Sequence, residues 1–227
     1  MRPATPHPVA RDDKTAQPDR ERLGPPLSLI SAIAAFLALF VALVALVSSR
    51  DPGNSSAEAG FARDMSVHHA QAVEMAEIVR DKTDSEQIRT MAADIALTQQ
   101  AHIGQMQGWL DVWGLPPTGA EPAMSWMGHP TEGRMPGMAS PEEINRLRDA
   151  PPDEADEMFL RLMIPHHKAA LPMARAVLER TDRPEVRRLA TAIVSSQKGE
   201  IKIMQEVLKS RGGKPEQGST SHTHEHH

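Results

Sequence analysis

Two stretches of this chain repeat one another at a fixed offset of 98 residues. Residues 61–110 align without a gap with residues 159–208, and 19 of the 50 aligned positions are identical. An ungapped match of this length indicates an internal duplication, so the two copies are expected to share one local structure. The identical pairs include Met65/Met163, His68/His166, His69/His167, Met75/Met173 and Gln99/Gln197. Core packing requires only apolar volume and does not explain the repeated histidines.

Length and composition favour one helical domain built from both copies. Each copy of about 50 residues is too short to bury a sufficient hydrophobic core alone, so the copies are expected to fold together. Aromatic residues make up only 3 % of the chain, and the repeats are rich in Ala, Leu, Met, Gln, Glu and Arg, which favours helix over sheet. The formal charge of −5 gives no electrostatic reason to expect a nucleic-acid partner. The absence of cysteine excludes disulfides, thiolate ligands and a cysteine nucleophile.

The hydrophobic spacing predicts two long helices in each copy. In the first copy, a 3-4-3-4 spacing that is typical of a helix packed against other helices is followed by a turn at 81–84. The second helix is expected to begin with Thr83 or Asp84 as its N-cap and to end near Gly114. The residues on these spacings are Met65, His68, Ala72, Met75 and Val79, and then Ile88, Ala92, Ile95, Gln99, His102, Met106 and Leu110. The two copies together predict an all-α four-helix bundle of two duplicated αα-hairpins, 57–114 and 153–212.

Proline-containing segments interrupt this plan in two places. Pro165 and Pro172 lie within the third long helix, which should therefore be kinked or lose backbone hydrogen bonds near its His-His pair. Between the hairpins, residues 115–152 are rich in Pro, Gly and Met and predict a linker. Ser140 and Glu143 have the spacing of a capping box, so a short helix is expected to begin at Ser140 within this linker.

Residues 27–47 form an uncharged stretch, rich in Leu, Ala, Val and Phe, that is long enough to span a bilayer as one helix. Five Lys or Arg residues precede it and only Arg50 follows closely, so the positive-inside rule predicts a cytoplasmic N-terminus and an extracytoplasmic bundle. Residues 1–26 are then a disordered cytoplasmic tail, and residues 48–56 are a short tether. A cleaved signal peptide is the alternative, although the stretch is longer than a usual signal-peptide core and no clear cleavage site follows it.

The duplicated histidines and methionines are candidate metal ligands. If each helix pair is an antiparallel hairpin, His68 lies level with Gln99, and Met65 lies level with His102. Two adjacent histidines point about 100° apart on a helix, so they cannot both fill one apolar seam. The candidate ligands are Met65, His68, His69 and His102 in the first hairpin, and Met163, His166, His167 and Glu200 in the second. The alternative is that the methionines fill the core and the histidines are structural or sense pH.

The softness of these ligands favours copper. Thioether and imidazole groups without thiolate suit Cu(I), and then Cu(II), better than iron, manganese or calcium. Met75 lies about 10.5 Å along the helix axis from His68, so it is a weaker ligand candidate and is expected to fill the core. Two further groups able to bind copper are Met124, Met127, His129, Met135 and Met138 in the linker, and His222, His224, His226 and His227 in the C-terminal tail, 213–227. For the first group, the alternative is a flexible linker whose methionines plug the bundle.

A longer pattern of repeated residues points to a family. It consists of Phe61, Met65, His68, His69, Ala72, Met75 and Ala76 in the first copy, and of Phe159, Met163, Ile164, Pro165, His166, His167, Ala170, Met173 and Ala174 in the second. This pattern resembles the signature of the domain-of-unknown-function family DUF305 over residues 57–212. The resemblance implies a ferritin-like four-helix bundle, and extracytoplasmic copper binding or resistance as in some members. The family often carries Glu where this chain has His102, whereas Glu200 keeps it, so the two copies are expected to differ as binding sites.

No motif for catalysis accompanies these ligands. No Glu is followed by His three residues later, which argues against the di-iron site of many ferritin-like bundles. A Ser-His-Asp order, a glycine-rich phosphate loop and an H-E-x-x-H motif are also missing from the sequence. We therefore expect a non-enzymatic metal-binding protein without an organic cofactor, whose partners are a copper ion and the membrane. The alternative is a non-catalytic extracytoplasmic interaction module.

Overall fold

The structure is a computed structural model that describes residues 27–48 and 51–212, with side chains of the first range described only at 30–43. Every element in these ranges is a helix. The helices are α1 (Leu27–Ser48), α2 (Ala57–Lys82), α3 (Glu86–Val112), the 3-10 helix η1 (Ser125–Met127), α4 (Pro141–Asp149), α5 (Pro152–Leu178) and α6 (Pro184–Ser210). The chain divides into two compact units, 1–50 and 51–227. The predicted tails at 1–26 and 213–227 lie outside the described residues.

The first unit contains α1, which coincides with the uncharged stretch of the sequence. Its described side chains are exposed, among them Phe36 at 71 % and Leu39 at 70 %. In the described part of the chain, no helix combines the length and the hydropathy that a membrane span requires.

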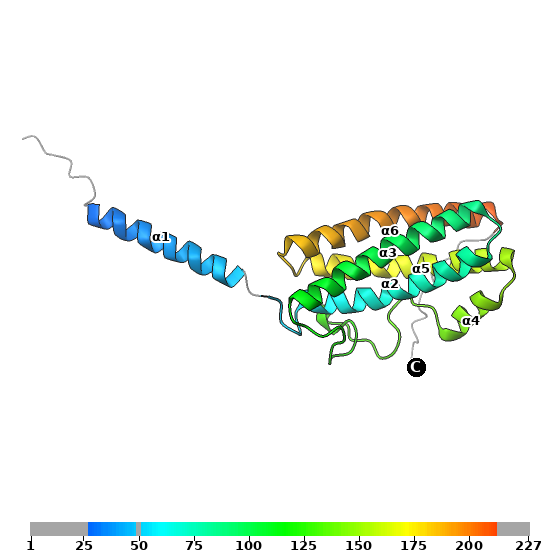
Figure 1. The fold of residues 1–227 in the computed structure, drawn as a ribbon, viewed down its shortest axis with the longest axis horizontal. Helices are drawn as coiled ribbons and strands as arrows, with labels where there is room; N and C mark the ends of the chain where they lie inside the picture. Colours follow the sequence, from blue (N-terminus) through cyan, green and yellow to red (C-terminus); the bar gives the residue numbers. More distant parts are fainter. Residues whose placement is uncertain (1–26, 49–50, 213–227) are drawn as a thin grey trace, which may run out of the picture. The chain divides into compact units, whose positions relative to one another are not determined.

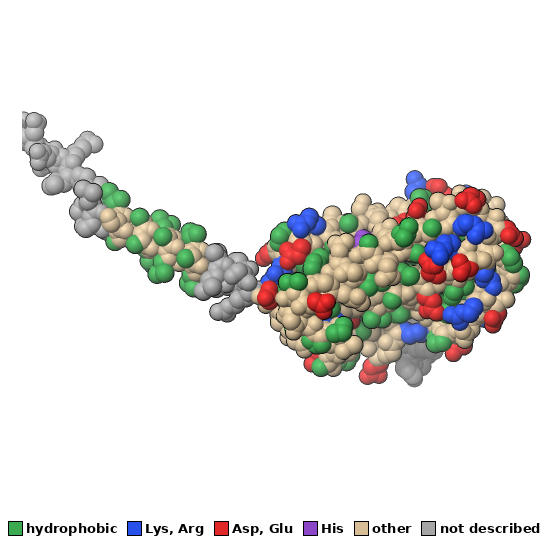
Figure 2. Space-filling model, viewed as in Figure 1, with side chains coloured by type: hydrophobic (Ala, Val, Ile, Leu, Met, Phe, Trp, Pro, Cys, Tyr) green, Lys and Arg blue, Asp and Glu red, His purple; other side chains and the backbone are tan. Residues whose placement is uncertain are grey.

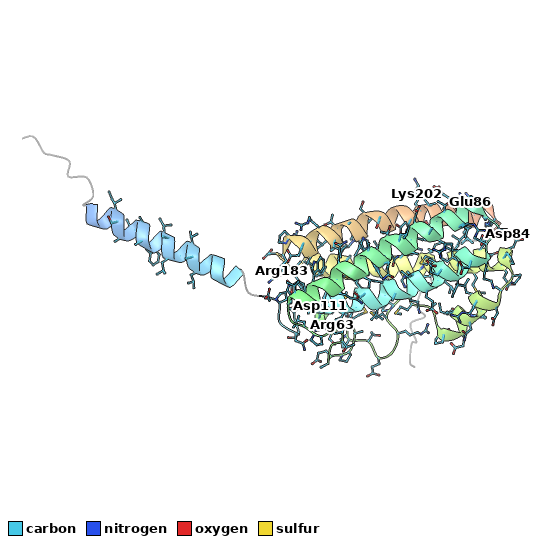
Figure 3. All side chains as sticks on the ribbon, viewed as in Figure 1. Arg63, Asp84, Glu86, Asp111, Arg183 and Lys202 are labelled. Carbon is cyan, nitrogen blue, oxygen red and sulfur yellow. The ribbon has the colours of Figure 1, made fainter. Side chains whose placement is uncertain are left out.

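Four long helices, α2, α3, α5 and α6, form the bundle of the second unit (Figure 1). Helix α2 packs against α3, α5 packs against α6, and the two hairpins meet mainly through α2 and α5. Figure 3 labels Glu86 and Lys202 at one end of the bundle and Asp111 and Arg183 at the other, so α3 and α6 run in opposite directions. On the face in Figure 2, acidic and basic side chains are interspersed over the bundle. The predicted all-α bundle is confirmed.

The predicted start of α4 is confirmed, but the predicted N-cap residue of α3 is wrong. This helix begins with Ser85 as its N-cap, and not with Thr83 or Asp84 as predicted. The physical reason is the Thr83 hydroxyl, which accepts a hydrogen bond of 3.0 Å from the backbone N–H of Ser85 and so extends the turn. The predicted short helix is present as α4, with a complete capping box between Ser140 and Glu143.

Helix α5 continues without interruption through Pro165 and Pro172. Each proline removes one hydrogen bond of the helical ladder, because it has no N–H to donate. Met163 and Met173 on either side are fully buried in the bundle, and this packing holds the helix together where the ladder is incomplete.

A polar layer divides the core of the bundle into two apolar blocks. The Met75 block joins the C-terminal halves of α2 and α6 to the N-terminal halves of α3 and α5, and includes Met75, Ile95, Leu147, Phe159 and Met204. The Met65 block joins the opposite halves to the linker, and includes Met65, Met106, Met135, Met173 and Ile193. Between the blocks lie six polar residues, each at most 2 % exposed: His68, His69, Gln99, His166, His167 and Gln197.

Candidate metal centre

The polar residues near the middle of all four long helices form the histidine layer. Its members are His68 and His69 of α2, Gln99 and His102 of α3, His166 and His167 of α5, and Gln197 and Glu200 of α6. The duplication places the same positions of each hairpin in this layer. The packing of α2 on α5 then brings both sets to one level of the bundle.

Contacts within each hairpin join the second histidine of a pair to the neighbouring helix. In the first hairpin, Nε2 of His69 lies 3.3 Å from Nδ1 of His102. In the second, the N–H of Nε2 in His167 donates to Oε2 of Glu200 at 2.7 Å. The structure thus brings His102 and Glu200 to equivalent places in the two hairpins, each against the second histidine of its pair.

The first histidines of the two pairs meet across the bundle. The ring centroids of His68 and His166 are 3.8 Å apart, with an angle of 37° between the ring planes. The rings of His166 and His167 are 6.3 Å apart. The layer is therefore one cluster shared by both hairpins and not two separate groups, because α2 and α5 face each other through His68 and His166.

Two fully buried methionines flank the layer, one in each apolar block. Met65 belongs to the Met65 block, and Met163 belongs to the Met75 block. Each lies about one helical turn before the histidines of its own helix. Met75 packs within the Met75 block, so the prediction that this side chain fills the core is confirmed.

Burial disfavours the charged form of four histidines of the layer, His68, His69, His102 and His166. It lowers the pKa of His68 to about 4, and lowers the pKa of His69 and His166 well below 6.5, because a charged ring would lose its hydration. Burial also lowers the pKa of His102, and the carboxylate of Glu200 partly offsets this effect. These histidines are therefore neutral at pH 7, and neutral imidazole is the form that binds metal ions.

Many polar atoms of the layer are buried without a hydrogen bond. Within the described residues, these atoms are Nδ1 of His68, His69, His166 and His167, Nε2 of His166, both amide atoms of Gln99, and Oε1 of Gln197. A buried polar atom without a partner costs about 1–3 kcal/mol, and native proteins contain few of them. The layer therefore contains a cluster of donor and acceptor atoms that no other described residue uses.

The donor atoms present fit a soft metal ion. Unpartnered imidazole nitrogens and nearby thioether sulfurs are the ligands that Cu(I) prefers among those available without cysteine. Among the described residues, no three His, Asp or Glu side chains are grouped so that they could hold one ion.

Gln99 and Gln197 are members of the layer that the sequence did not single out as functional residues. The sequence could have indicated them, because both copies have a glutamine at this position. It lies on a helix face whose other positions are mostly apolar. Their amides are able to donate or accept hydrogen bonds at the same level as the histidines.

The linker methionines lie in or against the core. Met124 and Met135 are 6 % and 5 % exposed and belong to the Met65 block, while Met127 and Met138 pack against it. His129 is exposed. This placement matches the alternative in which the linker methionines plug the bundle.

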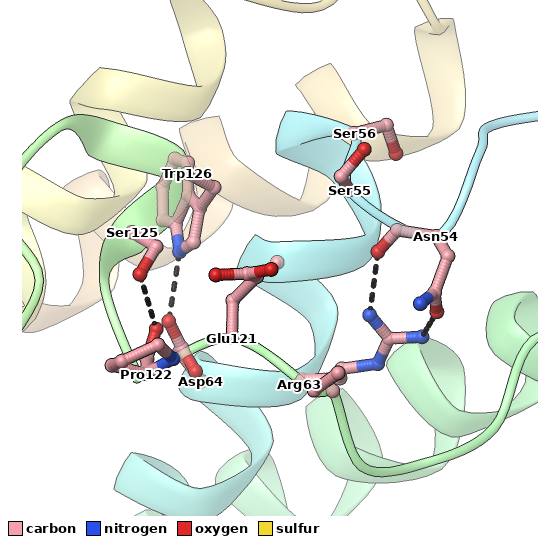
Figure 4. A pocket seen from close by; sticks show the side chains of 12 residues that line it. Asn54, Ser55, Ser56, Arg63, Asp64, Glu121, Pro122, Ser125 and Trp126 are labelled. Atoms are coloured by element: carbon pink, nitrogen blue, oxygen red, sulfur yellow. Dashed lines mark hydrogen bonds between the residues drawn. The ribbon is translucent and has the colours of Figure 1, made fainter.

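A pocket of about 420 Å³ lies at the start of α2, where side chains of α2 bind both the segment before this helix and the linker (Figure 4). Arg63 donates to the backbone oxygen of Asn54 at 2.8 Å and to its Oδ1 at 2.6 Å. Oδ2 of Asp64 accepts from Nε1 of Trp126 at 2.8 Å and from the backbone N–H of Met124 at 2.7 Å. Burial raises the pKa of the Asp64 carboxyl, and these two hydrogen bonds act against that rise. No residue of the histidine layer lines this pocket, so it is a separate feature.

Known proteins resemble this chain in fold or in sequence. A putative secreted DUF305 protein from Streptomyces coelicolor has a TM-score of 0.69 and 46 % identity, over 73 % of this chain and 100 % of that chain. CopM in its Cu(II)-bound form has a TM-score of 0.53 and 28 % identity, over 68 % of this chain and 97 % of CopM. The uncharacterized protein L153 of Acanthamoeba polyphaga mimivirus is 41 % identical over 56 residues, which span 25 % of this chain and only 37 % of that protein.

The family model described as "Domain of unknown function (DUF305)" matches residues 58–208. This range includes the linker, every residue of the histidine layer and all but the outermost residues of the two hairpins. The chain therefore belongs to the DUF305 family.

Proposed function

We propose that this protein binds copper in the histidine layer and buffers the ion or hands it on, without catalysing a reaction. One observation carries the proposal: the buried Nδ1 atoms of four histidines have no hydrogen-bond partner among the described residues. The similarity to CopM, which has been solved in Cu(II)-bound and Cu(I)-bound forms, supports copper as the metal.

The ligands that would hold the ion come from both hairpins. They are the imidazole nitrogens of His68, His69, His166 and His167 and the thioether sulfurs of Met65 and Met163. His102 and Glu200 touch the Nε2 atoms of His69 and His167, so they would orient these rings or join them as ligands. The soft donors would stabilise Cu(I) in a dry core from which water is excluded.

We further propose that residues 27–47 anchor the protein in the cytoplasmic membrane, with the bundle outside. The support is the uncharged stretch itself, the positive charges before it, and the helical conformation of Leu27–Ser48. An extracytoplasmic bundle would bind copper ions before they reach the cytoplasm.

A competition titration with a Cu(I) chelator tests the copper proposal. We expect residues 51–227 to hold at least one Cu(I) tightly, and to keep it when residues 213–227 are removed. The double variant His68→Ala/His166→Ala should lose this ion, whereas the control His129→Ala, at an exposed linker position, should keep it. Circular dichroism would show that each variant remains helical.

Full copper stoichiometry in the folded double variant would show that the histidines are structural. The non-catalytic interaction module would then be the better description of the bundle. Binding that disappears with residues 213–227 would move the copper site to the C-terminal tail.

A further inference from the structure

A short part of the linker, residues 134–139, lies over the first histidines of the two pairs. The carbonyl oxygen of Pro136 lies 3.2 Å from Nε2 of His68 on α2. On the α5 side, a Cβ atom added to Gly137 would stand 3.1 Å from Cα of His166. Residues 134–139 thus bridge α2 and α5 at the level of the histidine layer, and are named the strap.

Gln71 fastens the strap to α2. Its side-chain nitrogen donates to the backbone oxygen of Ala139 at 3.0 Å, and its Oε1 accepts from the backbone N–H of Ala139 at 2.7 Å. Gln71 lies three residues after His68, so the two side chains leave α2 on the same face. The fastening point is therefore adjacent to the histidine that the strap covers.

Gly137 allows the strap to lie directly on α5. Its φ of +76° is in the left-handed region, which favours glycine. A Cβ atom at this position would stand 2.5 Å from Cβ of Ala169 and 2.7 Å from the carbonyl oxygen of Pro165, which is too close for both. Any side chain here would lift the strap from the helix.

The strap also fixes the tautomer of His68. A carbonyl oxygen can only accept, so the hydrogen bond to Pro136 requires the proton of the neutral ring to be on Nε2. The lone pair is then on Nδ1, the ring nitrogen of His68 that is buried without a partner. The strap therefore holds His68 in the form whose free nitrogen is available as a ligand inside the layer.

We propose that the strap is the gate through which copper enters and leaves the histidine layer, and that Gln71 and Gly137 are positioning residues that keep it closed. This inference rests on the proposed copper function. Opening the strap requires three hydrogen bonds to α2 to break and the Met135 side chain to leave the Met65 block, while the backbone hydrogen bonds of the four long helices stay intact. The competing route lies between α3 and α6, where His102 and Glu200 are partly exposed.

The test measures transfer of Cu(I) from the full-length protein, in detergent micelles, to an excess of chelator. Gln71→Ala removes both fastening hydrogen bonds, and Gly137→Ala lifts the strap, so each should speed transfer by about tenfold. Two matched controls should leave the rate unchanged. Gln105→Ala changes an exposed glutamine of α3, and Gly133→Ala changes a glycine that also has positive φ but has open space around it.

A second measurement uses the metal-free protein. Amide hydrogen exchange at Ala139 should become faster in both strap variants, and nitrogen NMR should show that His68 no longer keeps its proton on Nε2. Unchanged copper transfer in variants whose Ala139 amide exchanges faster would overturn the gate and assign entry to the side of α3 and α6. A wild-type protein that binds no Cu(I) would overturn the copper proposal itself, whereas bound Cu(I) with unchanged transfer rates overturns only the gate.

Discussion

Gln99 brings a side-chain amide into the middle of a bundle whose core is apolar on both sides. Both of its amide atoms are buried without a partner among the described residues. Leucine has a similar volume and no polar atom, so we expect Gln99→Leu to raise the free energy of unfolding of the metal-free protein by about 1–3 kcal/mol. Urea unfolding followed by circular dichroism measures this change.

The control is Gln100→Leu, one residue later on the exposed face of α3. We expect this change to alter the free energy of unfolding by about 0.5 kcal/mol or less. A loss of stability in Gln99→Leu would mean that the amide of Gln99 makes stabilising contacts in solution.

Three buried histidines, His68, His69 and His166, make the stability of the metal-free bundle depend on pH. Their pKa is lowered in the fold, to about 4 for His68, while an unfolded chain has the usual value of 6.5. Below pH 6.5 the unfolded chain therefore binds protons that the folded chain does not. Stability should be full above pH 6.5 and should fall toward pH 4, by about 1.4 kcal/mol per pH unit for each histidine that stays neutral.

His166→Gln isolates one of these contributions. Urea unfolding is measured at a series of pH values between 7.5 and 4.5. Below pH 6.5, the free energy of unfolding of this variant should change with pH less steeply than that of the wild type, by about 1.4 kcal/mol per pH unit. The exposed His129 serves as the control, since His129→Gln should keep the wild-type slope. Equal slopes in all three proteins would show that His166 titrates normally in the fold.

Substitution of Met65 or Met75 on helix α2 distinguishes a packing role from a copper-binding role. Both side chains are on α2 and are fully buried, one in each apolar block. Met65→Ala and Met75→Ala should each lower the free energy of unfolding by about 2–5 kcal/mol, because both leave a cavity. Only Met65→Ala should also weaken Cu(I) binding, since Met65 lies one turn from the histidines and Met75 lies about two turns away.

Chelator competition on the two folded variants measures the affinities. An equal loss of affinity in both would indicate that copper binding responds to the packing of α2 and does not involve the sulfur of Met65.

The long helices could be predicted from the sequence, because apolar side chains repeat every three or four residues along them. Hairpin geometry predicted that Met65 lies level with His102, whereas the contacts of His102 with His69 and of Glu200 with His167 follow from side-chain directions that the spacing does not give. The contact between His68 and His166 could not be predicted, since a duplication repeats positions but does not say which faces of the two hairpins meet. The position of the strap could not be predicted from the sequence either, because the backbone of Ala139 is bound by a glutamine side chain 68 residues earlier.

At the scale of the whole molecule, the anchor and its orientation are a prediction from sequence. Protease added to intact spheroplasts should digest the bundle after residue 47, because the positive charges before residue 27 keep the N-terminus inside. Immunoblotting against the bundle measures the digestion, and a cytoplasmic protein that stays intact is the control. Complete protection of the bundle would contradict this orientation.

Each apolar block of the core contains residues of both hairpins. A polypeptide with only one hairpin would therefore leave its side of each block uncovered, and its first histidine would lack the ring that it contacts across the bundle. An ancestor with one hairpin could have buried those faces by forming a symmetric homodimer, with its His-His pairs meeting near the twofold axis. Two copies in one chain can differ from each other, and the first copy has His102 where the second has Glu200.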